Sequence, residues 1–330
     1  MKIRALNILI SVLIAALFLW LAFRNIDFSE LWNQILTVSY YWLPFFVITM
    51  TLSHFFRAER WRLLMPSNHQ KINRSTLFAG VMLGYVVNNI VPRLGEISRP
   101  VYVAKKGNIS AGNLVGTIVA ERLFDLFIML FLMVVTMFLL VTDTTQLQQI
   151  FGIENWTYLH YAMIPLIFAL LLLAVWVFYK LILLIDEKIE FQNPVLSKIV
   201  SSGLSFGEGM ISLKKVKNWP LFLLLTSAIW GGYIIMTYLP FFMMNMQQVF
   251  GLNLLDAVVL TVVSSIGVSV PTPAAIGSYH LFVQQALWLL YEVPLTKALT
   301  YATVAHAVNV LFVFIIGPIA LWWDKYSTLS

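Results

Sequence analysis

Cysteine is absent from the 330 residues, which excludes disulfides, thiolate nucleophiles and cysteine-based metal sites. Charged residues are also scarce: they make up 11% of the chain, whereas a soluble domain carries roughly a quarter. Hydrophobic residues make up 60%. A chain of this composition cannot face water on all sides, so we predict an integral membrane protein.

The sequence also lacks the signatures of common enzymes. It contains no phosphate-binding P-loop, no HExxH zinc motif, no nucleophile elbow and no paired aspartate motif for a metal–diphosphate. We therefore expect neither catalysis nor a metal or other cofactor. The net charge of +6 comes from basic residues that gather in particular loops. This pattern sets membrane topology, and we do not expect nucleic-acid binding.

Apolar runs of about twenty residues without strand-like alternation predict an all-α membrane protein with six full transmembrane helices. Each run is long enough to cross a hydrocarbon core of roughly 30 Å. The candidate spans are residues 5–23, 40–57, 114–141, 160–182, 219–245 and 298–323.

Two further apolar regions, 76–107 and 255–293, are interrupted by proline. The first breaks at Pro92, and the second at Pro271 and Pro273. Proline removes a backbone donor and disfavours helix before it, so backbone groups are left bare at membrane depth. Such groups are tolerated only where protein or a wet cavity supplies partners. We predict two re-entrant helical hairpins that enter the bilayer from opposite sides.

Loop charges place both termini in the cytoplasm of a bacterial inner-membrane protein. Residues 1–141 then form two spans, a hairpin and a span, and residues 142–330 repeat this series with inverted orientation. We predict a single membrane domain built as an inverted repeat, with a cytoplasmic amphipathic segment at 184–217. The alternative is two unrelated halves with kinked helices.

The first break carries the sharpest polar cluster, which contains Asn89, Arg93, Glu96 and Arg99. Charges at bilayer depth are costly and usually mark a site. The planar arginine fork matches phosphate, and a helix that begins after the break would add backbone N–H groups. We expect a binding site for a lipid headgroup phosphate. The alternative is a cytoplasmic rim whose charges extend outward to water.

Glu121, Arg122 and Asp125 lie at the start of the third long span. Glu121 and Asp125 are four residues apart and share one helical face, and Arg122 lies on its flank. These carboxylates either neutralise the arginines of the first break and relay charge, or form a purely structural ion-pair network. Arg57 and Arg60, with Arg62, close the second span, and we read them as anchors that contact anionic headgroups.

The second break offers bare carbonyls and small residues but no carboxylate or arginine. We expect a gate formed by Pro271, Pro273, Gly277 and His280. His280 titrates near neutral pH when it is accessible, although a histidine in an apolar helix is more often only hydrogen-bonded. His306 and Asn309, on one face of the last span, have the same two interpretations.

Three motifs occur in order along the chain: Asn89-x-x-Pro92-x-x-Gly95-Glu96-x-x-Arg99, Glu121-Arg122-x-x-Asp125 and Pro271-x-Pro273-x-x-x-Gly277. A weaker element, Arg60-Trp61-Arg62, precedes them. Together they resemble the lysylphosphatidylglycerol synthase transmembrane-region family, also called flippase-like domain proteins. The resemblance implies a membrane domain with re-entrant helices that moves phospholipid, in the type case an aminoacylated lipid, between leaflets.

The chain departs from the family pattern in two ways. Bifunctional members continue into a soluble aminoacyltransferase domain, whereas this chain ends at Ser330, so we expect no lysyl-lipid synthesis. Many members read Pro-Gly-Gly-x-Gly, followed three residues later by an acid. Here Ala274 and Ala275 replace the glycine pair, and His280 takes the acidic position. A cationic headgroup would lack a carboxylate partner there.

These observations favour a translocase for an anionic phospholipid or a lipid-linked glycan. Two other functions fit the same sequence. One is an ion-coupled transporter for a small solute. The other is a non-catalytic membrane subunit that acts by contact with a glycosyltransferase or a lipid-synthesis complex.

Overall fold

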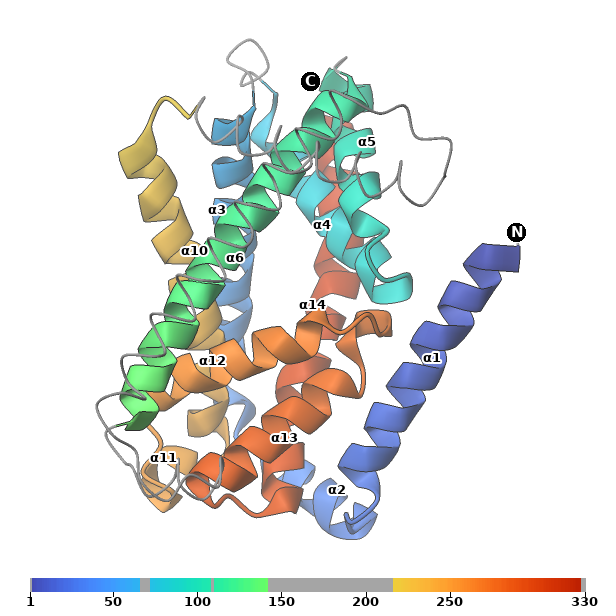
Figure 1. Ribbon diagram of the computed structural model, residues 1–330. Coiled ribbons are helices and arrows are strands. Elements are labelled where there is room, and N and C mark those ends of the chain that lie inside the picture. The colour runs from blue at the N-terminus through green and yellow to red at the C-terminus, as the bar shows by residue number, and fades with distance from the viewer. Residues whose placement is uncertain (1, 66–71, 108–109, 142–215, 328–330) are drawn as a thin grey trace, which may run out of the picture.

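The computed structural model describes residues 2–65, 72–107, 110–141 and 216–327, which are helical throughout apart from short connections and contain no strand (Figure 1). The predicted all-α class is confirmed for these residues. The candidate span 160–182 lies outside the described residues, as does 184–215, most of the predicted cytoplasmic segment.

The first half contains α1 (Lys2–Phe23), α2 (Phe28–Leu36), η1 (Tyr40–Trp42), α3 (Leu43–Leu64), α4 (Arg74–Ile90), α5 (Gly95–Gly107) and α6 (Ala111–Val141). The second half contains α10 (Trp219–Met243), α11 (Met246–Val249), α12 (Leu254–Ser269), η3 (Pro273–Ala275), α13 (Ser278–Tyr291) and α14 (Leu295–Ser327). Among the described residues, the long helices fall where the apolar runs predicted them.

Among the described residues, α10 and α14 are each long and apolar enough to cross a membrane. Helices α1 and α2, which are bent by 86° relative to each other, add a third span if the two together form a single crossing. Helices α3 and α6 are as long, with 22 and 31 residues, but both carry several charges within their length. The predicted count of six spans is therefore not confirmed.

Both Pro-interrupted regions form helical hairpins. Helix α4 packs against α5 across the break at 91–94, and α12 packs against α13 across the break at 270–277. In Figure 1 the first hairpin occupies the upper half of the molecule and the second the lower half, and their breaks face each other beside α1. Both α1 and α4 contact η3, which lies in the second break. Re-entry of these hairpins into a bilayer stays a prediction.

The helix contacts follow a reciprocal pattern. Helices α3 and α10 pack against each other, α6 contacts α12 of the second hairpin, and α14 contacts α4 of the first. Each hairpin also packs on the helix that follows it, α5 on α6 and α13 on α14. An inverted repeat would produce this exchange. The repeat stays a prediction, because the expected counterpart of α1 lies outside the described residues.

The second break is built from left-handed backbone. Ala274, Ala275 and Gly277 have φ angles of 50°, 57° and 84°. Glycine adopts this region without steric cost, whereas alanine does not. A Gly-Gly pair would therefore fit this backbone without strain, whereas Ala274 and Ala275 adopt it at a steric cost. The Ala274 carbonyl lies 2.7 Å from Nε2 of His306 on α14, which fixes the break to that helix.

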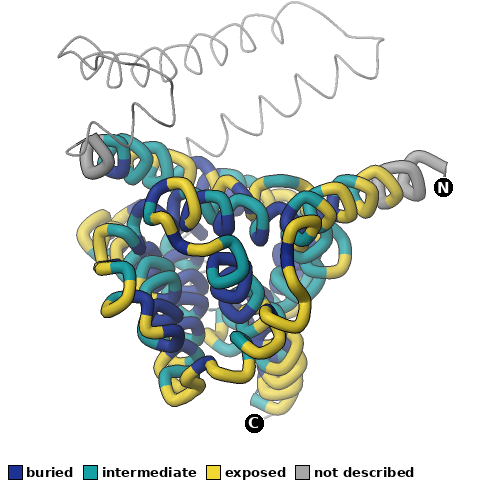
Figure 2. The backbone as a smooth tube through the Cα atoms, turned by 90° about the horizontal axis from the view of Figure 1, so that it is seen from below, coloured by how far each residue is buried: buried dark blue, intermediate teal, exposed yellow. Residues whose placement is uncertain are grey.

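Buried residues gather inside the bundle, and α1 extends from it with a largely exposed surface (Figure 2). Leu9, Leu13, Leu17 and Trp20 of α1 are among the exposed apolar side chains. Where α1 does meet the bundle, its backbone packs on Gly277. A Cβ added at Gly277 would lie 2.6 Å from the Ala15 carbonyl oxygen. The contact between α1 and the second break therefore requires glycine.

We predict that Gly277→Ala destabilises the protein by roughly 1–3 kcal/mol, because the new methyl group strains a left-handed residue and pushes on α1. Thermal unfolding of the purified protein in detergent measures the effect. Gly231 in α10 is the matched control, since a Cβ there meets nothing within 4 Å. Gly231→Ala should be neutral or stabilising by up to about 1 kcal/mol. Equal effects of the two substitutions would contradict the packing described here.

Candidate functional site

A cluster of five charged side chains lies inside the bundle, and we call it the buried ion cluster. It consists of Arg57 and Arg60 on α3, Arg99 on α5, and Glu121 and Asp125 on α6. Arg60 and Glu121 are both 0% exposed. A lone charge at such a position costs several kcal/mol, so the cluster persists only because its members pair.

Arg57 lies at the centre of the buried ion cluster. Its Nε is 2.6 Å from Glu121 Oε1, and its Nη2 is 2.7 Å from Asp125 Oδ2. Its Nη1 donates to the hydroxyl groups of Tyr85 on α4 and Tyr233 on α10, at 2.7 and 2.9 Å. One guanidinium thus joins α3, α4, α6 and α10.

The other two arginines complete the pairing. Arg60 Nη1 lies 2.7 Å from Asp125 Oδ1, and Arg99 Nη2 lies 3.1 Å from Glu121 Oε2. The Arg99 guanidinium also stacks 4.0 Å above the Trp61 ring. Trp61 donates its indole N–H to Thr117 on α6 at 2.8 Å. The buried ion cluster therefore holds α5 and α6 against α3.

The prediction that Arg57 and Arg60 contact lipid headgroups was wrong, because both side chains are buried in ion pairs. The spacing of the charges was the missed signal. Arg57 and Arg60 are three residues apart, so they lie on one face of α3. Glu121 and Asp125 are four apart and present two carboxylates to that face. Two complementary pairs on different helices are typical of a buried network.

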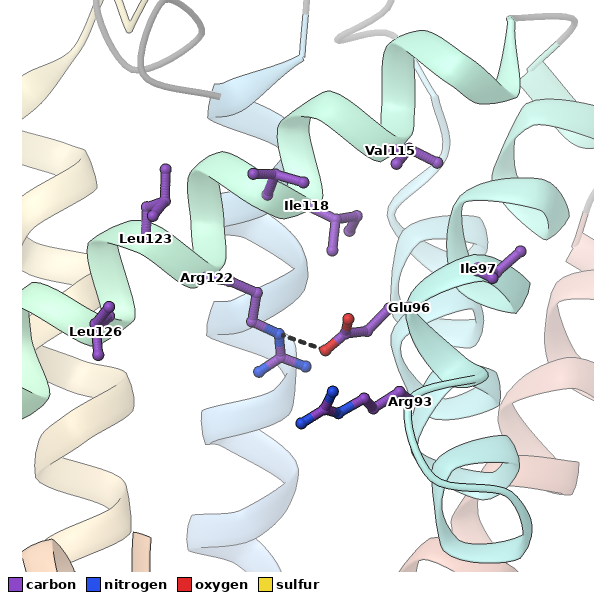
Figure 3. A pocket seen from close by; sticks show the side chains of 9 residues that line it. Arg93, Glu96, Ile97, Val115, Ile118, Arg122, Leu123 and Leu126 are labelled. Atoms are coloured by element: carbon purple, nitrogen blue, oxygen red, sulfur yellow. Dashed lines mark ion pairs between the residues drawn. The ribbon is translucent and has the colours of Figure 1, made fainter. Parts of the chain in front are cut away.

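A groove of about 400 Å³ lies beside the buried ion cluster, between α5 and α6 (Figure 3). Its walls are mostly apolar, and three charged residues line it. The lining residues are Arg93, Glu96, Ile97, Val115, Ile118, Val119, Arg122, Leu123 and Leu126. We call this space the α5–α6 groove. Its exposed members include Ile97, Val115 and Leu126, so the groove opens toward the surroundings of the protein.

The charged end of the α5–α6 groove contains one ion pair and a further arginine. Arg122 Nε lies 3.4 Å from Glu96 Oε1, and both side chains are less than half exposed. The two point toward each other in Figure 3, and Arg93 extends toward the same space. Arg93 and Glu96 are three residues apart in the sequence, but they form no ion pair with each other. Glu96 pairs across the groove with Arg122 instead.

The N–H groups at the start of α5 are satisfied by the Asn88 side chain of α4 and by carbonyl groups of the first break. Asn88 Oδ1 accepts from the Gly95 N–H at 2.6 Å. The N–H groups of Glu96 and Ser98 donate to the carbonyls of Arg93 and Leu94. The expectation that this helix start offers free N–H groups to an anion was therefore wrong, because these donors already have partners.

Gly95 of the first motif has a packing role that the sequence did not reveal, whereas Asn89 does not line the α5–α6 groove. A Cβ at Gly95 would lie 2.0 Å from the Gly84 carbonyl oxygen, so glycine is required for the close approach of α5 to α4. Asn89 does not cap α5 either, and its buried Nδ2 has no hydrogen-bond partner among the described residues. Its neighbour Asn88 makes the cap.

The residues predicted to form a gate lie around the second break. Gly277 and His280 are buried, Pro273 is partly buried, and Pro271 is exposed. The His280 ring packs against the His306 ring, with centroids 4.8 Å apart. Asn309, three residues after His306 on α14, is exposed. A gating role for these residues stays a prediction.

A model of the lysylphosphatidylglycerol synthase transmembrane region matches residues 8–317. The chain belongs to this family. Two UPF0104 membrane proteins of Methanocaldococcus jannaschii are similar to it. One is 29% identical over 195 residues, which cover 58% of this chain and 74% of that protein. The other is 22% identical over 335 residues, which cover 97% and 96%. No solved structure gives a significant match.

Family membership makes the chain a membrane protein, and it agrees with the helical, apolar spans described above. The matched region includes both helical hairpins, the buried ion cluster and the α5–α6 groove. The resemblance that the three motifs suggested is thereby confirmed at the level of the family.

Glu121→Gln should destabilise the protein by about 3–5 kcal/mol, because it leaves buried arginines without their shared carboxylate. Glu96→Gln is the matched control, since it breaks a half-exposed ion pair and should cost no more than about 1 kcal/mol. Thermal unfolding in detergent compares the two. A Glu121→Gln variant as stable as Glu96→Gln would show that the buried ion cluster does not support the fold.

Proposed function

We propose that this protein is a lipid translocase, and not an enzyme, which moves an anionic phospholipid or a lipid-linked glycan between leaflets. The observation that carries the proposal is the α5–α6 groove, which combines apolar walls with Arg93, Glu96 and Arg122 at one end. It opens to the surroundings of a membrane protein, where acyl chains are the available ligand. A solute transporter would instead need a cavity closed to lipid.

The chemistry of the groove suits a phosphate with attached tails. Arg93 and Arg122 carry two positive charges against the single negative charge of Glu96, which leaves an excess of one. A guanidinium matches phosphate oxygens through parallel N–H donors. The aliphatic wall, which includes Ile118 and Leu126, contacts hydrocarbon favourably. In this proposal the phosphate occupies the charged end, and the tails leave between α5 and α6.

The two hairpins supply a route for movement. Their breaks face each other beside α1 (Figure 1), so polar groups from both are available to a headgroup as it crosses. The tails stay in lipid, the first break and Arg122 bind the phosphate, and the Pro271–Gly277 break acts as the gate. We place the protein in the cytoplasmic membrane with both termini in the cytoplasm. Phospholipid is the partner this proposal requires.

The proposal predicts that Arg93→Gln and Arg122→Gln together slow lipid movement at least roughly tenfold, because charge-assisted hydrogen bonds to phosphate are lost. Proteoliposomes containing fluorescent phosphatidylglycerol measure the rate through accessibility of the headgroup to a membrane-impermeant quencher. Lys105→Gln is the matched control. It removes one positive charge where the double variant removes two, and it does so at an exposed residue near the end of α5 that does not line the groove.

Two results would contradict the proposal. In the first, the wild-type protein moves no phosphatidylglycerol above the rate of empty vesicles. In the second, the double variant moves lipid as fast as Lys105→Gln. A wild-type protein that imports a small anion but moves no lipid would favour the solute transporter.

A further inference from the structure

We infer that a second anion site lies behind the Glu96–Arg122 ion pair, at the buried arginines, and that it takes a phosphate or phosphodiester oxyanion. This inference deepens the proposed function and rests on it for the identity of the cargo. The geometry points to this site through a small inner cavity of about 20 Å³, lined by Arg57, Gly84, Tyr85, Asn88 and Arg99 among others. That volume is enough for one water molecule, so it admits one oxygen atom of the anion while the rest stays on the side of the groove.

Glu96 and Arg122 line both spaces. They belong to the α5–α6 groove and also to the inner cavity. Their ion pair, 3.4 Å long and partly exposed, therefore lies where the groove and the inner cavity adjoin. A half-exposed pair of this kind is worth at most about 1 kcal/mol, so its opening is inexpensive. When it opens, the two spaces join.

The charges of the buried ion cluster, which borders the inner cavity through Arg57 and Arg99, do not balance. Arg57, Arg60 and Arg99 face two carboxylates, Glu121 and Asp125, which leaves one excess positive charge among the described residues. The Glu96–Arg122 pair adds nothing to this sum. A buried excess charge is costly, and a bound anion would neutralise it.

The cavity also presents a donor that no protein group uses. Arg99 lines the cavity, is 6% exposed, and its buried Nε has no hydrogen-bond partner among the described residues. Arg57 lines the same cavity with two tyrosine hydroxyls on its Nη1. An oxyanion that displaces water there would accept from Arg99 and lie close to Arg57. A buried donor without a partner is rare in proteins, and a bound anion would supply the acceptor that this donor lacks.

Glu96 competes with the anion in this arrangement. Its carboxylate occupies Arg122 when the site is empty, and the incoming phosphate takes its place when the pair opens. The consequence is an anion that passes from the groove arginines to the buried arginines without losing its positive partners. Two classes of ligand share this chemistry, a lipid headgroup and free inorganic phosphate.

Phosphate binding to the full chain in detergent tests the inference. Thermal stabilisation is titrated with sodium phosphate at constant ionic strength, since a ligand that binds only the folded state raises its stability. Glu96→Gln should tighten binding roughly threefold to tenfold, because it removes the competing carboxylate. Gly84→Ala should weaken binding at least roughly tenfold, because Gly84 lines the inner cavity and its new methyl group would press on the Arg99 side chain that donates to the anion.

Gly116 provides the control for Gly84→Ala. A Cβ at Gly84 lies 3.3 Å from Arg99 Cβ, whereas a Cβ at Gly116 in α6 meets nothing within 4 Å. Gly116→Ala should bind phosphate as the wild type does. If Gly84→Ala also binds as the wild type, the anion stays in the outer groove and the inference is wrong. It is equally wrong if neither the wild type nor Glu96→Gln binds phosphate.

Short-chain phosphatidylglycerol identifies the source of the anion. If this lipid binds more tightly than phosphate, the ligand is a lipid headgroup. If it binds equally or more weakly, the ligand is free phosphate. Either result supports the inner site, provided that binding depends on Gly84. The proteoliposome assay separates the inner anion site from the proposed function. Lipid movement without Gly84-dependent phosphate binding would overturn the inner site alone, whereas phosphate binding without lipid movement would overturn the proposed function alone.

Discussion

The pairing of three arginines with two carboxylates inside an apolar bundle is the constraint on which the rest of the structure depends. Arg57 alone reaches side chains of α4, α6 and α10 from its position on α3. Buried charges lose their hydration, so each of them requires a partner of opposite charge within the protein. The first hairpin is held in place because its second helix contributes Arg99 to that pairing.

The same constraint explains how the α5–α6 groove remains available. Glu121 and Asp125 hold α6 to α3, and Arg99 holds α5 to α6 at the level of the buried ion cluster. Outside that level the two helices are linked by the weaker Glu96–Arg122 pair. A strong buried contact thus fixes the helices, and a half-exposed one is left to exchange its partner with a ligand.

Sequence patterns predicted the hairpins and the long helices well, because proline breaks and apolar runs act locally. They also singled out Glu121 and Asp125 and left open whether these residues are structural. Arg57 and Arg60 were missed, because basic residues at a helix end commonly anchor a span. Only the tertiary arrangement of α3 opposite α6 shows that they face inward. The Glu96–Arg122 pairing was hidden for the same reason, since 26 positions of chain separate two residues that meet across a groove.

The central claim is that an anionic lipid binds in the α5–α6 groove with its phosphate at the arginines. An experimental density map of the protein in nanodiscs that contain phosphatidylglycerol tests it most directly. The account predicts lipid density in the groove, with the phosphate within hydrogen-bonding distance of Arg93 or Arg122 and the acyl chains leaving between α5 and α6. A map with a well-ordered, empty groove, and lipid bound only elsewhere on the protein, would contradict it.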